Sequence, residues 1–292
     1  MRARAPASAA NLGPGLDVLA VALDRYVEVE VEPAERFTLQ SSGEGAALSA
    51  GAEHLAARVA IGVTGHDRLA ITVRSEVPVA RGLGSSAALA VAAAAAAGAA
   101  DPMTVAARLD GHADNAAAAT CGGLVAVHEA GERVRVARLA LDPGLAFVAL
   151  VPERGLSTAL AREALPAVVP RGDAIFNLSR ITLLLQGLAD RRLLAREAAE
   201  DRLHQTYRTP LFEEAPALLA ALVDGGALAA CWSGAGPTLL GICAGEDVAE
   251  VAAAGRDGLA ASGVAGSVKV LHADLDGLVT GDAARLPVRA DA

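Results

Sequence analysis

A glycine-rich segment between a predicted strand and an alanine-rich helix constrains this chain more than any other feature. It consists of Pro78, Val79, Ala80, Arg81, Gly82, Leu83, Gly84, Ser85, Ser86, Ala87 and Ala88. The glycines allow the backbone to approach a ligand, and the helix start offers unpaired N–H groups and a partial positive charge, an arrangement that binds phosphate. No Gly-Lys-Ser/Thr follows, so the lysine of the Walker pattern is absent and either serine hydroxyl can approach phosphate or magnesium instead.

The same residues can also form an ordinary glycine-rich turn capped by serine, and a bare Gly-x-Gly-Ser-Ser string would favour that interpretation. Two further blocks favour the phosphate loop. One covers residues 6–17 and carries a Gly-Pro-Gly turn between Asn11 and Asp17, and the other covers residues 233–238 with the string Ser-Gly-Ala-Gly-Pro-Thr. Glycines in such loops allow the backbone to press against phosphates or a substrate.

Two kinds of periodicity divide the chain. In the first half, alternating apolar and polar residues predict strands at 26–31, 69–74 and 134–136, and an apolar run predicts a buried strand at 145–151. In the second half, helical spacing predicts helices at 173–188, 191–200, 210–223 and 247–261, with short strands at 227–232, 238–243 and 266–271. This mixture predicts an α+β fold with mainly antiparallel sheets covered by helices. A break at Pro152 suggests two domains, residues 1–150 and 151–292, with a loosely held tail from about Asp274.

Charge and apolar content limit the partners and the location of the chain. With 34 acidic and 25 basic residues the net charge is −9, and no basic stripe interrupts the acidic background, which argues against nucleic acid or an anionic membrane as partner. No apolar core of a signal peptide follows the N-terminus, so a cytoplasmic location is expected. The longest uncharged apolar run, residues 87–100, falls short of a membrane span and predicts a buried helix.

Taken in order, the blocks at residues 6–17, 78–88 and 233–238 resemble the three motifs of the GHMP kinases, the family of galactokinase, homoserine, mevalonate and phosphomevalonate kinases. A chance origin would require three independent matches in the right order across about 230 residues, and the small probabilities of these matches multiply. The resemblance implies the two-domain fold of that family and an enzyme that transfers phosphate from ATP to an alcohol group of a small molecule. It also implies that residues 78–88 bind the nucleotide, with Ser86 as a contact of Mg²⁺.

The opening block and the string Gly-His-Ala-Asp-Asn at residues 111–115 resemble the homoserine kinase branch in particular. The substrate implied is L-homoserine, and the product is O-phospho-L-homoserine, an intermediate of threonine biosynthesis. By this resemblance Asn11 and Asp17 contact the amino acid, and Asp17 takes its ammonium group. Two later strings resemble segments whose final arginines hold the substrate carboxylate, so Arg180 and Arg208 are the expected clamp. An amino acid needs such partners for its two charged groups.

The same resemblance implies that His112 lines the homoserine pocket and that Asn115 lies beside the transferring group, and both are the candidate catalytic residues. A helix start capped by Asp114 or Asn115, with an incidental histidine, is the alternative. Asp110 stands where many relatives have glutamate and is a second candidate metal ligand, although aspartate reaches one methylene less far. Phosphoryl transfer depends mostly on positioning and electrostatics, and the resemblance implies transfer without a dedicated base.

Two other functions stay open at this stage. One is another GHMP kinase that acts on mevalonate or a sugar, and the other is a nucleotide-binding regulator of the same fold without catalysis. Mevalonate and sugars lack the ammonium group that Asp17 would bind, and a regulator has little reason to keep all three blocks. Because relatives are commonly dimers, a homodimer can form through an edge strand of the first half.

Overall fold

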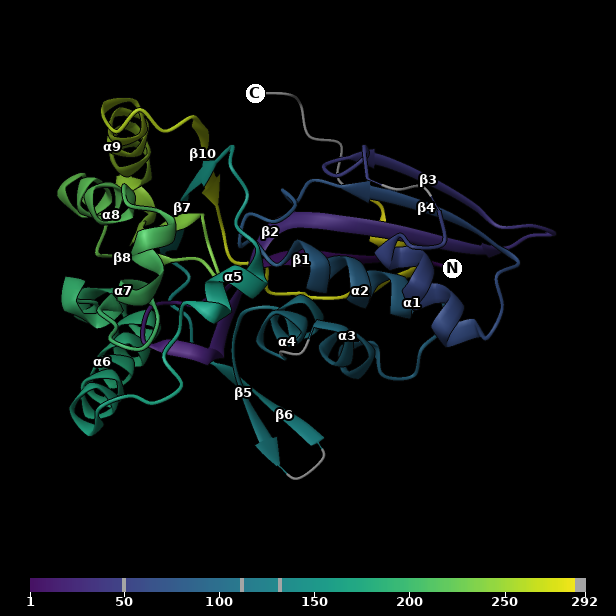
Figure 1. Ribbon diagram of the computed structural model, residues 1–292, viewed down its shortest axis with the longest axis horizontal. Helices are drawn as coiled ribbons and strands as arrows, with labels where there is room; N and C mark the ends of the chain where they lie inside the picture. Colours follow the sequence, from purple (N-terminus) through teal and green to yellow (C-terminus); the bar gives the residue numbers. More distant parts are fainter. Residues whose placement is uncertain (49–50, 111–112, 131–132, 287–292) are drawn as a thin grey trace.

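The computed structural model describes residues 1–48, 51–110, 113–130 and 133–286 and contains two β-sheets with helices packed on them (Figure 1). The first sheet comprises β1 (Arg2–Asn11), β2 (Gly15–Pro33), β3 (Thr38–Gly43), β4 (Leu69–Ser75), β5 (Leu124–Ala130), β6 (Arg133–Leu139) and β11 (Val279–Thr280). The second comprises β7 (Leu145–Pro152), β8 (Ala229–Trp232), β9 (Leu239–Ala244) and β10 (Gly266–Leu271). The helices are α1 (Leu55–Thr64), α2 (Ser85–Ala96), α3 (Pro102–Asp110), α4 (Asp114–Cys121), α5 (Thr158–Glu163), α6 (Arg171–Ala189), α7 (Gln205–Arg208), α8 (Ala215–Asp224) and α9 (Val248–Ala261). The predicted α+β fold is confirmed.

The first sheet depends on β2, a long strand that runs antiparallel to β1, β4 and β5. Its valines at 27, 29 and 31 are buried, as the period-two pattern predicts, because alternate side chains of a strand point to the same face. Most neighbouring strands are antiparallel, and β3 joins β4 in parallel. The register of β1 shifts next to Pro6, where proline has no N–H group to offer to a ladder.

The alanine-rich helix α2 lies within the helical layer on the first sheet. It packs against β1 and β2 and is flanked by α1, α3 and α4 (Figure 1). Nearly all of its residues after Ser86 are buried, which confirms the prediction of a buried helix, and alanine side chains allow its neighbours to approach closely. Across the described ranges, no helix has the length and apolar content that crossing a bilayer requires.

The second sheet is antiparallel throughout, with β7 between β10 and β9. Both faces of β7 are buried, as its continuous apolar sequence predicts. Phe147 and Ala149 belong to the core that joins the first sheet to α6, whereas Val148 and Leu150 belong to the core under α8 and α9. The chain changes sheets between β6 and β7, and it returns to the first sheet when β11 pairs with β1.

Two local predictions are wrong. Residues 191–200 form 3₁₀ turns, Arg191–Leu193 and Arg196–Ala199, in place of a helix, because Asp190 caps the first turn and the chain folds back tightly onto α6. The predicted tail from about Asp274 is anchored as far as residue 286, and its last part, residues 287–292, lies outside the described residues. The Asp274 carboxylate is buried and accepts a hydrogen bond from the Tyr26 hydroxyl at 3.0 Å, and β11 extends the first sheet.

The packing on β7 leads to a stability prediction. Replacing Phe147, which is fully buried, with alanine should lower the free energy of unfolding by about 3–5 kcal/mol, because lost contacts and a residual cavity both destabilise the fold. The control is Leu178→Ala on α6, where the side chain is 66% exposed and a change within about 0.5 kcal/mol is expected. Urea unfolding measures both, and equal losses would contradict the core assignment.

Candidate active site

A cavity of about 550 Å³ lies where the phosphate loop meets residues from both halves of the chain. Its lining includes Ser41 of β3, Leu55 of α1 and Val73 of β4, and from the segment between β3 and α1 it includes Glu44, Leu48, Glu53 and His54. From the opening block and α4 it includes Asn11, Asp17, Asp114 and Asn115, and from the second half Thr158, Arg162, Arg208, Gly234 and Ala235. Of the predicted nucleotide loop, it includes Val79, Ala80, Gly82, Gly84, Ser85, Ser86 and Ala87.

The phosphate loop is packed directly between the other two glycine-containing blocks. A Cβ atom on Gly82 would lie 2.3 Å from the Ser233 carbonyl oxygen, and one on Gly84 would lie 2.1 Å from Ser8 Oγ. Both glycines have positive φ, and Ser233 Oγ donates to the Gly82 carbonyl at 2.7 Å. Three blocks far apart in the sequence therefore form one wall, and the start of α2 opens into the cavity at Ser85 and Ser86.

The Arg81 side chain does not take part in that wall. Its Nε donates to the Pro152 carbonyl at 2.8 Å and its NH1 group to the Val79 carbonyl at 3.0 Å, and it also contacts the Glu153 carbonyl. These bonds tie the loop to the end of β7. The Arg81 side chain therefore holds the loop in place, and it is not among the described residues that line the cavity.

Asn115 is oriented by Ser8, whose hydroxyl donates to Asn115 Oδ1 at 2.8 Å. With its oxygen engaged, the amide offers its NH₂ group to an oxygen bound in the cavity. Asn115 lies in the first turn of α4 and follows Asp114, a carboxylate that is only 2% exposed and also lines the cavity.

The turn after β1 holds several residues in the left-handed region, where side chains are strained. Asn11 stabilises it, since its Nδ2 donates to the Gly234 carbonyl at 2.9 Å and its Oδ1 accepts from the Asp17 backbone N–H at 3.0 Å. Asn11 thus joins the first block to the third while it lines the cavity. The Asp17 carboxylate forms an ion pair with Arg162 at 2.8 Å.

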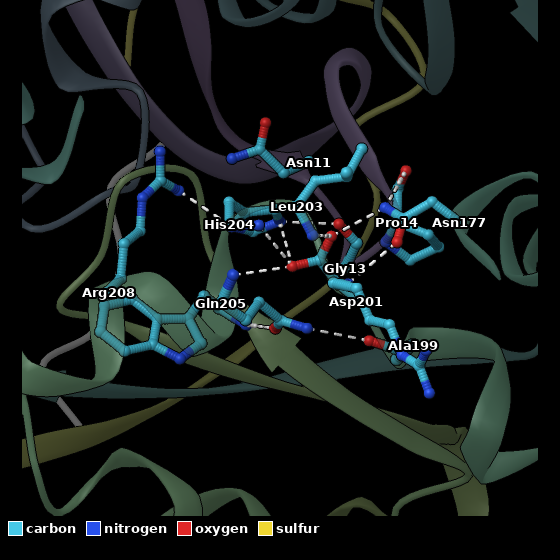
Figure 2. Close-up of polar contacts among 12 residues, drawn as sticks. Asn11, Gly13, Pro14, Asn177, Ala199, Asp201, Leu203, His204, Gln205 and Arg208 are labelled. Atoms are coloured by element: carbon cyan, nitrogen blue, oxygen red, sulfur yellow. Dashed lines mark hydrogen bonds and ion pairs between the residues drawn. The ribbon is translucent and has the colours of Figure 1, made fainter. Parts of the chain in front are cut away.

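Arg208 is buried at the cavity wall with 2% of its surface exposed. Its Nε donates to the Ala161 carbonyl at 3.1 Å, and its NH1 group donates to the Gly234 carbonyl at 3.0 Å. The NH1 group also contacts His204 Nδ1 at 3.0 Å (Figure 2). Burial lowers the pKa of Arg208 to about 10, so the side chain is a cation at neutral pH. A buried cation beside a cavity favours an anionic ligand group.

The two predicted clamp arginines are not brought together. Arg180 pairs with Glu200 at 2.8 Å and stacks 4.2 Å from the Phe176 ring, and it is not among the described residues that line the cavity. Arg162 of α5 lies there instead, beside Asp17 and near Arg208. No role in the site was assigned to Arg162 from the sequence.

Two further predicted site residues have no described side chain. His112 lies outside the described residues, and Asp110 ends α3 without a described side chain. In the described ranges, no cluster of three or more His, Cys, Asp or Glu side chains is arranged to hold a metal ion. Magnesium in kinases uses few protein oxygens together with phosphates and water, so the exposed Ser86 hydroxyl fits such a site.

Comparisons with known proteins agree on one family. Residues 46–123 match the family described as GHMP kinases N terminal domain, and residues 183–260 match GHMP kinases C terminal. A homoserine kinase of Moorella thermoacetica is 40% identical over 259 residues, covering 83% of this chain and 87% of that protein. Another from Desulfitobacterium hafniense is 32% identical, covering 95% and 98%. A homoserine kinase structure from Cytophaga hutchinsonii aligns with a TM-score of 0.83 at 24% identity, covering 96% of each chain.

The packing of the loop leads to a test of nucleotide binding. Gly82→Ala places a Cβ against the Ser233 carbonyl and must displace the loop, so ATP affinity should fall by about tenfold or more, as measured by calorimetry. Gly98→Ala is the matched control, because Gly98 also has positive φ but an added Cβ meets nothing within 4 Å. Unchanged ATP affinity in the Gly82 variant would remove the loop from the nucleotide site.

Proposed function

Because this chain belongs to the GHMP kinase family, we propose that it transfers the terminal phosphate of ATP to the side-chain hydroxyl of L-homoserine. Homoserine kinases that are 32–40% identical over most of the chain support the assignment. One observation of this structure carries it. Asp17, Arg162 and Arg208 line the same cavity as the phosphate loop, and together they match the ammonium and carboxylate groups of an amino acid.

In the proposed complex, Arg208 and Arg162 hold the carboxylate and Asp17 holds the ammonium group. Asp17 and Arg162 already form an ion pair at 2.8 Å, and a zwitterion can insert its two charges so that each finds an opposite charge. Asn11 contributes by fixing the backbone of Asp17, because its Oδ1 accepts from the Asp17 N–H group while its Nδ2 donates to the Gly234 carbonyl. Arg180 is omitted from this clamp because it pairs with Glu200.

ATP is proposed to lie along the remaining length of the cavity. The phosphates would meet the N–H groups at the start of α2, where the helix dipole favours negative charge. The base would lie against the lining from β4 and α1, which includes Leu55 and Val73. When bound, Mg²⁺ would neutralise charge on the phosphates, with Ser86 as the proposed contact and Asp110 as the second.

Catalysis then rests on positioning. The transition state spreads charge over the equatorial phosphate oxygens, and the Asn115 NH₂ group, turned by Ser8, is placed to donate to an oxygen there. His112 is kept as the proposed neighbour of the homoserine pocket. The tight contact of the phosphate loop with the third block keeps the phosphates and the substrate clamp in fixed relation.

A coupled assay of the purified protein with ATP and magnesium tests the function directly. L-homoserine is compared with mevalonate, with galactose and with no acceptor. Turnover that depends on homoserine and yields a phosphorylated product is the expected result. Turnover with another acceptor would keep the kinase and refute the substrate, and ATP binding without turnover would favour a regulator of the same fold.

The substrate clamp can be tested by comparing two arginines. Arg162→Ala removes a proposed partner of the carboxylate and should raise the homoserine KM by about tenfold or more, with little change in the ATP KM. Arg180→Ala is the control, because Arg180 is paired with Glu200 away from the cavity lining, and its homoserine KM should stay within about twofold. A larger effect at Arg180 would restore the clamp that the sequence predicts.

A further inference from the structure

His204 lies fully buried between the turn after β1 and the Arg208 guanidinium (Figure 2). Its Nε2 is 2.7 Å from the Gly13 carbonyl oxygen, and its Nδ1 is 3.0 Å from the NH1 group of Arg208. A carbonyl oxygen only accepts hydrogen bonds, and a guanidinium only donates them. The ring must therefore be neutral, with its hydrogen on Nε2 and a lone pair on Nδ1.

The position of this ring is set by Asp201. The Asp201 carboxylate accepts from the backbone N–H groups of Leu203, His204 and Gln205 at 2.7–2.9 Å and from Asn177 Nδ2 at 2.8 Å. Those bonds hold α7, a helix of four residues that is too short to be stable by itself. The ring and Arg208, four residues later, are thereby carried on one fixed turn.

Protonation of His204 would break the arrangement. A second hydrogen, on Nδ1, would point at the Arg208 N–H group, so two donors and two cations would face each other in a buried site. Burial lowers the pKa of His204, while Asp201, with Oδ2 3.7 Å from Nε2, and Asp17 raise it and Arg208 lowers it further. The net direction is downward, which agrees with the neutral ring that the hydrogen bonds require.

We propose that neutral His204 is a positioning residue for the substrate clamp: it orients Arg208 toward the carboxylate and ties it to the turn that carries Asp17. The inference rests on the proposed function, because the clamp is the one assigned there to L-homoserine. Asn11 and Arg208 both bond the Gly234 carbonyl, and His204 bonds both Gly13 and Arg208. Arg208, the proposed carboxylate ligand, is therefore connected by two routes to the turn that precedes Asp17, the proposed ammonium ligand. Acidification that charges the ring should weaken substrate binding and leave ATP binding intact.

Two substitutions separate the two contacts of the ring. In His204→Asn the amide oxygen takes the place of Nδ1 and can still accept from Arg208, whereas in His204→Gln the amide nitrogen takes the place of Nε2 and keeps only the bond to Gly13. We expect the homoserine KM to stay within about threefold in His204→Asn and to rise about tenfold or more in His204→Gln. The ATP KM should be unchanged in both, which also shows that the variants are folded. An equal homoserine KM in wild type and His204→Gln would overturn the proposal.

The pH profile gives a readout that a purely structural role would not move. In the wild type, the homoserine KM should rise as pH falls through the pKa of buried His204, which burial lowers from the ordinary histidine value of about 6.5. Homoserine keeps both of its charges across pH 5–8, so the substrate does not cause the rise. His204→Asn cannot take up the proton and should lack this rise. The same acid rise in both proteins would assign it to another group and contradict the proposal.

A measurement without turnover separates this inference from the proposed function. In ¹⁵N-labelled wild-type protein at pH 7, the imidazole signal lost in His204→Asn should show the neutral tautomer with hydrogen on Nε2. A charged ring, or a hydrogen on Nδ1, would refute the arrangement whatever the substrate is. If wild type shows the expected tautomer but does not turn over homoserine, the proposed function fails and the positioning of Arg208 stands on its own, to be tested against whichever acceptor is found.

Discussion

A buried guanidinium with neutral hydrogen-bond acceptors is the constraint around which the second half of the site is organised. Arg208 is 2% exposed, and its bonds reach the carbonyls of Ala161 and Gly234 and the ring of His204. Holding a cation in this way costs free energy, which an anionic ligand group can offset. Arg208 of α7 is thus bonded to three segments. They are α5 through Ala161, the residue before α7 through His204, and the block at residues 233–238 through Gly234.

The cavity wall formed by the phosphate loop depends on close contacts that only glycine permits. Gly82 and Gly84 touch the third and first blocks, and Gly13 approaches the Ala199 carbonyl so closely that a Cβ would lie 2.4 Å from its oxygen. These contacts hold the phosphate loop against the blocks at residues 6–17 and 233–238. The same turn at Gly13 also bonds His204, which contacts Arg208. Phosphoryl transfer needs little covalent chemistry from the protein, so this fixed relation between donor and acceptor sites is what the chain contributes.

Features with a local cause could be predicted from the sequence. Period-two alternation located the valines of β2, the run of alanines located the buried helix α2, and the glycines located the turn that precedes this helix. The choice between Arg162 and Arg180 was not local. It depends on which acid each arginine meets after folding, Asp17 or Glu200. The anchoring of Asp274 by Tyr26 likewise joins positions far apart in the chain, which no short pattern reveals.

The most direct test of the central claim is a crystal structure with magnesium, L-homoserine and a non-hydrolysable ATP analogue. We expect the homoserine carboxylate within hydrogen-bond distance of Arg208 and Arg162, its ammonium group at Asp17, and the phosphates at the start of α2. His204 should keep its bonds to Gly13 and Arg208. A carboxylate bound at Arg180, or an amino acid outside the cavity, would contradict the clamp and the organisation of the site around Arg208.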